Sequence, residues 1–276
     1  MSVNEHRTSR TAAGLSSAEV ALDKKTAAAA LLPASQPQLL PSVDPNATRL
    51  AAYLDRLCEK ADLLLDIQLG PQAWIEAIRE QDGWLNPTFD PRSSDADESN
   101  SGSVVLRDGN GRVLACNAVR LFETDSFVSL LSSGDLFHRL GHPNRTPQRS
   151  ILPAGYDLAG RISYSGGTLV TPSARGRRLA LLTTRLVRLI GERLFRADWH
   201  TGVIFHTRDG RMPDKPYGFQ RITPCLEALT IPERPQAQTL FLVELSRAEF
   251  RLQLASDLAR LQAKGHEDLD DLALLT

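Results

Sequence analysis

The feature that most constrains the fold is an apolar segment that runs into a basic, glycine-containing loop and then into a long amphipathic segment. The loop is Arg175-Gly176-Arg177-Arg178, and it follows an apolar run over residues 161–170. After the loop, apolar side chains recur every three or four positions to residue 195, which is the spacing of one buried helix face. The pattern predicts a strand over residues 161–170 and a helix over residues 175–195. The apolar residues 199–206 predict a second strand.

A strand, a helix and a strand in succession favour two parallel strands joined by a crossover. Gly166-Gly167 interrupts the first strand, which indicates a bulge or a close approach of the backbone. Upstream, Asp108-Gly109-Asn110-Gly111 between two apolar runs is a hairpin signal. Residues 218–223 and 239–245 are also strand-like. The sequence therefore predicts an α/β fold with a mixed sheet.

Further helices are predicted on both sides of this core. Asp44-Pro45 is a good helix start, and leucines at helical spacing continue that helix until Gly70 stops it. A second helix is predicted over residues 71–81. Near the other end, Ser246 and Glu249 have the spacing of a capping box, which predicts a final helix.

Composition divides the chain into three parts. Residues 1–44 are rich in Ala, Ser, Thr and Pro and contain no aromatic residue. Such a segment buries too little apolar area to offset the entropy of ordering it, so a disordered leader is predicted. Residues 45–265 are predicted to form one domain with helical additions, and residues 266–276 a frayed acidic tail. Within the domain, residues 123–160 form a long connection of the kind that often shapes a substrate site.

Charge and composition exclude several classes of protein. The formal net charge is −1, which does not fit a protein that coats nucleic acid or an anionic membrane. No stretch reaches the roughly 18 apolar residues of a membrane span, and the N-terminus lacks the apolar core of a signal peptide. The cytoplasm is therefore the predicted location. The three cysteines are far apart, and Asp135, His138 and His142 match no metal motif, so no metal is predicted.

The basic loop favours anion binding at the start of the long helix. The first amides of a helix have no partner within it, and the helix dipole adds positive potential there. Gly176 lets the backbone approach a ligand closely, and Arg175, Arg177 and Arg178 add charged donors. From the loop alone, the alternative is a solvated basic helix terminus without a ligand.

The same segment resembles the acetyl-CoA-binding motif of the GNAT superfamily of N-acetyltransferases. In that family a strand, often with Val and Pro at its end, precedes an Arg/Gln-x-x-Gly-x-Gly/Ala loop and a long helix. The residue after the Arg or Gln is itself often Gly. The corresponding residues here are Val170, Pro172, Arg175, Gly176 and Ala180. The resemblance covers roughly residues 103–246, because Val203-Ile204-Phe205 and Gly218-Phe219 also stand where the family has its next strand and a Gly-Phe pair.

The sequence departs from the family pattern at three positions. Arg178 stands where Gly is usual, and Thr207 stands where Asn is frequent. Asp214 stands where a Tyr frequently protonates the leaving thiolate, and Tyr217 is displaced to the residue before Gly218.

The resemblance implies a mixed central sheet that splays apart beside the bulged strand and is flanked by helices. It implies acetyl-CoA or another acyl-CoA as cosubstrate, with the pyrophosphate on the loop amides and the pantetheine along the strand. The implied cofactor-binding residues are Leu169, Val170, Thr171, Arg175, Gly176, Arg177, Arg178, Leu179, Ala180 and Thr207.

The resemblance also implies direct transfer of the acyl group to an amine, whose ammonium form must first lose a proton to a base. His206, at the end of its strand, is the predicted base, with Glu123 and Asp157 as alternatives. Tyr217 is the predicted general acid. Each of these residues also has a purely structural interpretation: a structural hydrogen bond for His206, packing in a turn for Tyr217, and solvation for the two carboxylates.

The sequence thus favours an acyl-CoA-dependent N-acyltransferase that acts on a small-molecule or peptide amine. Two alternatives stay open: a catalytically silent CoA-binding or regulatory module, and a synthase that uses long-chain or carrier-protein thioesters. Whether the helices over residues 45–81 and 247–264 cap the core or form a homodimer interface also stays open. Nucleic acid is disfavoured as a partner.

Overall fold

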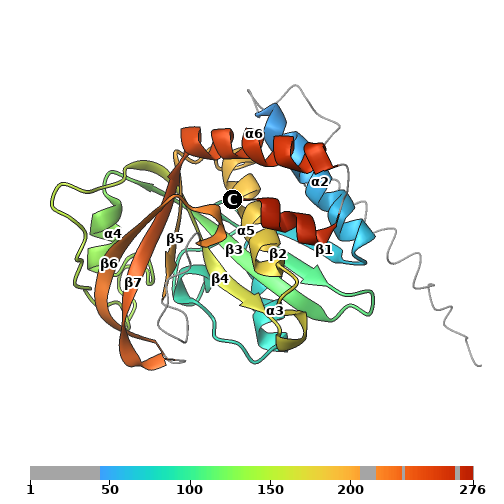
Figure 1. Ribbon diagram of the computed structural model, residues 1–276. Coiled ribbons are helices and arrows are strands. Elements are labelled where there is room, and N and C mark those ends of the chain that lie inside the picture. The colour runs from blue at the N-terminus through green and yellow to red at the C-terminus, as the bar shows by residue number, and fades with distance from the viewer. Residues whose placement is uncertain (1–43, 206–215, 232–233, 265–267, 276) are drawn as a thin grey trace, which may run out of the picture. The chain divides into compact units, whose positions relative to one another are not determined.

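A seven-stranded mixed sheet forms the centre of the part of the chain that the computed structural model describes, residues 44–205, 216–231, 234–264 and 268–275 (Figure 1). The strand order is β1-β2-β3-β4-β5-β7-β6, and only the β4–β5 pair is parallel. The strands are β1 (Leu64–Leu69), β2 (Ser101–Arg107), β3 (Val113–Thr124), β4 (Gly160–Val170), β5 (Trp199–Ile204), β6 (Arg221–Ile231) and β7 (Arg234–Ser246). The predicted α/β class with a mixed sheet is confirmed.

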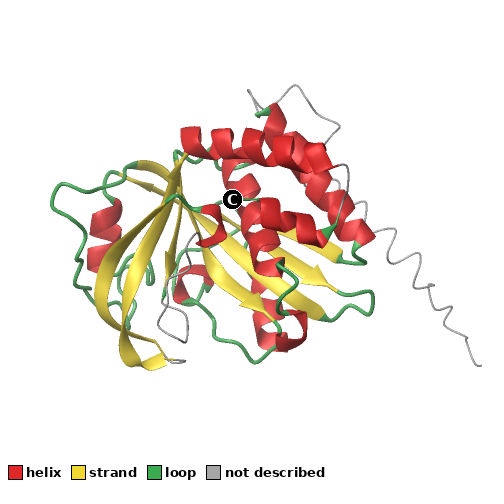
Figure 2. Cartoon of the chain, in the orientation of Figure 1, coloured by secondary structure: helices red, strands yellow, loops and turns green. Residues whose placement is uncertain are grey.

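Helices cover both faces of this sheet. They are α2 (Pro45–Lys60), α3 (Gln72–Glu80), α4 (Phe127–Ser133), α5 (Leu179–Arg193) and α6 (Arg247–Lys264). Figure 2 shows α2, α5 and α6 together on one side of the strands, and α2 packs on both α5 and α6. On β2, Gly102 lies against Ile190 of α5, whereas Val105 belongs to the core that contains α3. Strand residues an odd number apart point to opposite faces, so α3 and α5 sandwich the sheet.

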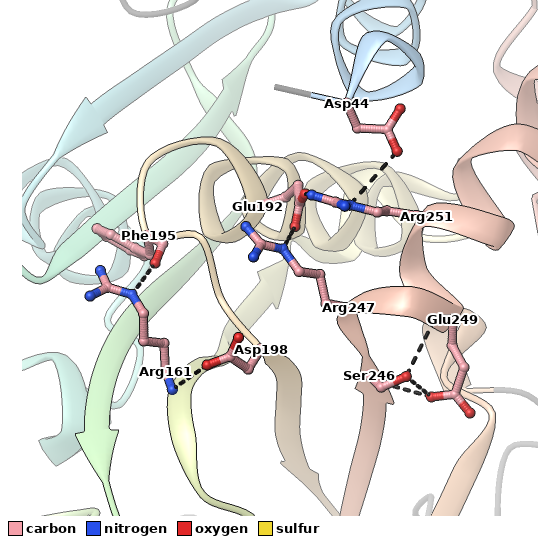
Figure 3. Close-up of polar contacts among 9 residues, drawn as sticks. All are labelled: Asp44, Arg161, Glu192, Phe195, Asp198, Ser246, Arg247, Glu249 and Arg251. Carbon is pink, nitrogen blue, oxygen red and sulfur yellow. Dashed lines mark hydrogen bonds and ion pairs between the residues drawn. The ribbon is translucent and has the colours of Figure 1, made fainter. Parts of the chain in front are cut away.

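Ion pairs join the three helices of the α5 face. Glu192 of α5 is only 4% exposed and accepts hydrogen bonds from Arg247 and Arg251 of α6 (Figure 3). Arg251 also lies 3.9 Å from Asp44, the residue that caps α2. A buried carboxylate with two guanidinium partners is compensated, and it holds the long helix against its neighbours.

Local capping signals in the sequence give the observed helix starts. The Asp44 carboxylate accepts from the Asn46 amide at 2.8 Å, and α2 begins at Pro45. Ser246 and Glu249 form the predicted capping box: each accepts from the other's backbone amide, and α6 begins at Arg247 (Figure 3). The predicted hairpin between β2 and β3 is also confirmed, with Gly111 at φ +81° in the turn.

Two predictions about the ends of the domain are wrong. The first helix stops at Lys60, because Asp62 takes up a left-handed conformation (φ 53°), and β1 follows instead of further helical turns. Leu64 and Leu65 fit the helical spacing of the preceding leucines, but they belong to β1, an edge strand. Only Ile67 is buried in this strand, so the two leucines do not form a buried helix face. At the other end, the acidic tail is not frayed in residues 268–275. It forms a 3-10 helix, Leu269–Leu274, and Leu272 is fully buried.

The described part of the chain contains no helix that is both long enough and apolar enough to span a membrane.

Candidate functional site

The sheet opens between its two parallel strands. β4 and β5 pair only over residues 162–165 and 199–202. Beyond this point β4 stays paired with β3, while β5 stays paired with β7, so the two strands diverge (Figure 1). The closed end is fixed by Arg161, whose amide donates to Asp198 and whose guanidinium donates to the Phe195 carbonyl (Figure 3). The splayed sheet that the resemblance implied is therefore present.

A glycine bulge begins at the point of divergence. Two residues of β4, Gly167 and Thr168, oppose the single residue Asn117 of β3, which confirms the predicted bulge. Gly167 has φ +64°, and its carbonyl accepts a hydrogen bond of 2.8 Å from the indole N–H of Trp74. The buried indole of α3 thereby fixes the shape of the strand where it leaves β5.

A cavity of about 980 Å³ lies at the opening. The diverging strands line it through residues 165–170 of β4 and residues 202–204 of β5. Aromatic and apolar side chains from other elements complete the wall, among them Trp84, Phe137, Phe219 and Leu240. A cavity of this size with mainly apolar walls and a few polar groups has the properties of a small-molecule site.

Four of the predicted cofactor-binding residues line this cavity: Leu169, Val170, Thr171 and Arg175. Gly176, Arg177, Arg178, Leu179 and Ala180 follow directly in the loop and in the first turn of α5. Thr207 lies outside the described residues. The strand edge and the first residue of the basic loop therefore border the same cavity, whereas residues 176–180 are not among its lining.

The loop after β4 leaves backbone donors free at the start of α5. A 3-10 turn, Pro172–Ala174, uses the amides of Ala174 and Arg175, and the Arg177 amide donates to the Ala174 carbonyl. Among the described residues, no acceptor is found for the amides of Gly176, Arg178, Leu179 and Ala180. Unsatisfied amides at a helix N-terminus, together with three exposed arginine side chains, are features that favour an anion.

Arg178 takes up the conformation that favours glycine. It precedes α5 with φ 58° and ψ 16°, and its side chain is exposed. The helix start therefore keeps a geometry suited to Gly although the sequence departs from the family motif at this position. The exposed side chain does not fill the turn.

We expect Arg178→Gly to raise the free energy of unfolding by about 0.5–1 kcal/mol, because the left-handed conformation is strained for a residue with a Cβ. Urea denaturation at 25 °C measures the change. Arg177→Gly is the matched control: Arg177 is an equally exposed neighbour whose φ is not positive, so added chain entropy should make that variant less stable. Equal losses in both variants would contradict this explanation of Arg178.

Tyr217 reaches the cavity from a strained turn. It lies in the 3-10 segment Pro216–Gly218 with φ 57°, and it lines the cavity. Burial raises the pKa of its phenol, so the hydroxyl stays protonated at neutral pH. A protonated phenol on a residue that lines the cavity has the protonation state that a general acid requires.

Of the three predicted bases, the two carboxylates do not line this cavity. His206 lies outside the described residues, as does Asp214. Glu123 is 62% exposed and pairs with Arg161, and Asp157 accepts from the amides of Val128 and Leu158. Neither carboxylate lines the cavity. Both are exposed, in keeping with the plainer role of solvated carboxylates, and each also contacts the chain.

His138 is a cavity residue that the sequence did not single out as a base. Its ring stacks on that of His142 at 4.6 Å, and burial followed by the charge of His142 lowers its pKa. Nδ1 is buried and finds no hydrogen-bond partner among the described residues. A neutral imidazole in the cavity can accept a proton. In the described residues, no group of three or more His, Cys, Asp or Glu residues could hold a metal ion.

No protein-family model matches the chain, and no curated protein matches it. In fold it is similar to NAA60 of Arabidopsis thaliana in complex with a bisubstrate analogue, at 10% identity and a TM-score of 0.41, over 67% of this chain and 98% of that one. The same enzyme in complex with acetyl-CoA gives 11% identity and a TM-score of 0.40, over 67% and 99%. A spermidine N-acetyltransferase from Vibrio cholerae gives 8% and 0.37, over 69% and 96%. This is a likeness of fold to GNAT N-acetyltransferases, and by itself it carries no argument about activity.

Proposed function

We propose that this chain is an acyl-CoA-dependent N-acyltransferase of the GNAT type. The observation that carries the proposal is the coincidence of three features: parallel strands that diverge at a glycine bulge, a cavity at that opening, and free helix amides at its edge. The strand edge suits an extended pantetheine arm, and the helix start suits a pyrophosphate. Neither feature alone would identify the ligand, because basic helix termini are common.

The binding part of the proposal rests on the loop and on β4. The free amides of Gly176, Arg178, Leu179 and Ala180 would donate to the pyrophosphate oxygens, with the helix dipole adding positive potential. The edge of β4 that faces away from β3 has no strand partner after residue 165 among the described residues. Backbone groups of Leu169, Val170 and Thr171 would pair there with the pantetheine amides.

The chemical part of the proposal assigns proton transfers to two side chains. The thioester supplies an activated acyl carbon and a thiolate leaving group. His138 would take the proton that the attacking amine loses, and the Tyr217 hydroxyl would give a proton to the departing sulfur. A backbone amide of the diverging strands would stabilise the oxyanion. His206 stays an alternative base.

Saturating acetyl-CoA is expected to stabilise the protein. A ligand at 100 times its Kd adds about 2.7 kcal/mol to the free energy of unfolding. For a domain of this size we expect a rise in Tm of about 5–8 °C, measured by differential scanning fluorimetry. Acetyl-pantetheine at the same concentration is the matched control: it lacks the pyrophosphate, so it should shift Tm by less than half as much. Equal shifts, or none, would refute the assignment of the loop.

The same samples decide between the open alternatives. Thiol release in the presence of a panel of small and peptide amines is expected for an N-acyltransferase. Binding of acetyl-CoA without thiol release from any amine would assign a silent CoA-binding module instead. Turnover with a long-chain acyl-CoA or an acylated carrier protein, but not with acetyl-CoA, would assign the synthase. The cytoplasmic location and a homodimer stay predictions.

A further inference from the structure

Arg188 of α5 is a buried arginine whose contacts converge on the turn that carries Tyr217. It is 1% exposed, and Nη2 donates to the backbone carbonyl of Tyr217. Nη1 donates to Oε1 of Gln253 at 3.3 Å, and the guanidinium carbon lies 3.9 Å from the centre of the Phe219 ring. The two ends of the turn, residues 217 and 219, are therefore both held by this one side chain.

Gln253 of α6 holds the middle of the same turn. Its Nε2 donates to the Gly218 carbonyl at 2.7 Å, while its Oε1 accepts from Arg188 and, at 2.8 Å, from Arg185. Arg185 in turn lies 3.2 Å from Asp257. Side chains of α5 and α6 thus fix two consecutive carbonyls of the turn beside the cavity.

The turn needs such support because Tyr217 has φ 57° and ψ 24°. A left-handed conformation is uncommon for an aromatic residue and persists only where the surroundings impose it. The support is itself costly, since a guanidinium is removed from water. Among the described residues no carboxylate lies within 4.0 Å of Arg188, so its direct contacts are with carbonyl oxygens and an aromatic ring, and the charge of Asp257 acts on it from farther away. Packing alone would be served better by an apolar side chain.

We propose that Arg188 and Gln253 are positioning residues that place the Tyr217 hydroxyl in the cavity. The inference rests on the proposed function, in which Tyr217 protonates the leaving thiolate. Neither residue touches the reacting atoms: both act through the backbone of residues 217 and 218. Their loss should therefore lower kcat while leaving the KM for acetyl-CoA nearly unchanged.

The first test observes Tyr217 directly and needs no activity. The chain has four tyrosines, so protein labelled with 3-fluorotyrosine gives few 19F resonances, and Tyr217→Phe identifies the one from Tyr217. In Arg188→Met we expect that resonance to shift or broaden and the pKa of the fluorinated phenol to fall toward that of free 3-fluorotyrosine. Arg185→Met is the comparison variant: Arg185 is equally buried one turn earlier and donates to the same Gln253 Oε1, so its loss should disturb the Tyr217 resonance less than the loss of Arg188. An unchanged Tyr217 resonance in Arg188→Met would overturn the inference.

The second test is a double-mutant cycle in kcat. Arg188→Met should reduce kcat about 10-fold or more with a KM change below about 2-fold, and should add less than about 3-fold when Tyr217 is already Phe. Full additivity of the two substitutions would overturn the inference. Should Arg188→Met not fold, Arg188→Lys keeps a charged donor and is expected to give a smaller loss of the same kind. Wild-type protein that releases no thiol refutes the proposed function instead, while the fluorine experiment still decides whether Arg188 holds Tyr217.

Discussion

Gly167→Ala is expected to lower the free energy of unfolding by about 3 kcal/mol, a large loss for a single methyl group on a glycine. Gly167 has φ +64°, which strains any residue with a Cβ. An added Cβ would also lie 2.5 Å from Cζ2 of Trp74 and within 3.0 Å of two more indole atoms. Trp74 is fully buried, so it cannot move aside cheaply, and its 2.8 Å hydrogen bond to the Gly167 carbonyl would be lost. Urea denaturation followed by tryptophan fluorescence measures the loss.

Gly176→Ala separates the two causes. Gly176 has a similar φ of +82°, but an added Cβ would meet no atom within 4 Å. We therefore expect this variant to lose only about 1 kcal/mol, the strain of the left-handed conformation alone. If both variants lost the same amount, the contact between Gly167 and Trp74 would not be the reason for a glycine at the bulge. Gly167→Ala should also weaken the stabilisation by acetyl-CoA, because the bulge shapes the strand edge of the site.

The elements that the sequence predicts best are those with a local physical cause. Asp44-Pro45 and the pair Ser246 and Glu249 satisfy helix amides within a few residues, so the starts of α2 and α6 follow from short stretches of sequence. Gly167 is similar: paired glycines in a strand indicated a bulge, and the bulge is present. At the loop, the predicted helix start, residue 175, is too early, since α5 begins at Leu179. An arginine gives no indication of a left-handed turn, so the sequence did not predict the one at Arg178.

The parts that the sequence predicts poorly depend on distant contacts. Residues 64–69 have leucines at helical spacing, and only pairing with β2 makes them a strand. His138 comes from a long connection whose path is fixed by contacts such as the Arg139 amide with the Ser93 carbonyl. Nothing in the local sequence tells which histidine reaches the cavity. The support of Tyr217 by Arg188 likewise joins residues far apart in the chain.

The contribution of His200 to the free energy of unfolding is expected to fall by about 2.5 kcal/mol between pH 6.5 and pH 4.5. The side chain is fully buried beside Phe250, with 4.4 Å between the ring centres, and neither ring nitrogen finds a partner among the described residues. Burial, and then the charges of Arg188 and Arg247, lower its pKa to about 3. The folded protein therefore keeps His200 neutral, while the unfolded chain takes up a proton near pH 6.5. The contribution of His200 to stability is therefore full above about pH 6.5 and falls as the pH drops toward 3.

The experiment must isolate His200 from carboxylates that titrate in the same range. Burial and the charge of Glu249 raise the pKa of Glu244 to about 7, which makes acidification from pH 7 to 4.5 stabilising and so opposes the effect of His200. Hydrogen bonds from Arg221 lower the pKa of Glu249 to about 2, so its contribution is lost only below about pH 4.5.

The quantity to measure is therefore the difference in the free energy of unfolding between wild type and His200→Leu, by urea denaturation at several pH values from 7.0 to 4.5. The variant keeps both carboxylates and an apolar volume against Phe250. Between pH 7.0 and 4.5, the change in its free energy of unfolding should therefore lack the loss of about 2.5 kcal/mol that His200 causes in the wild type. Parallel curves would mean that His200 binds its proton as readily in the folded protein as in the unfolded chain, and so has access to water.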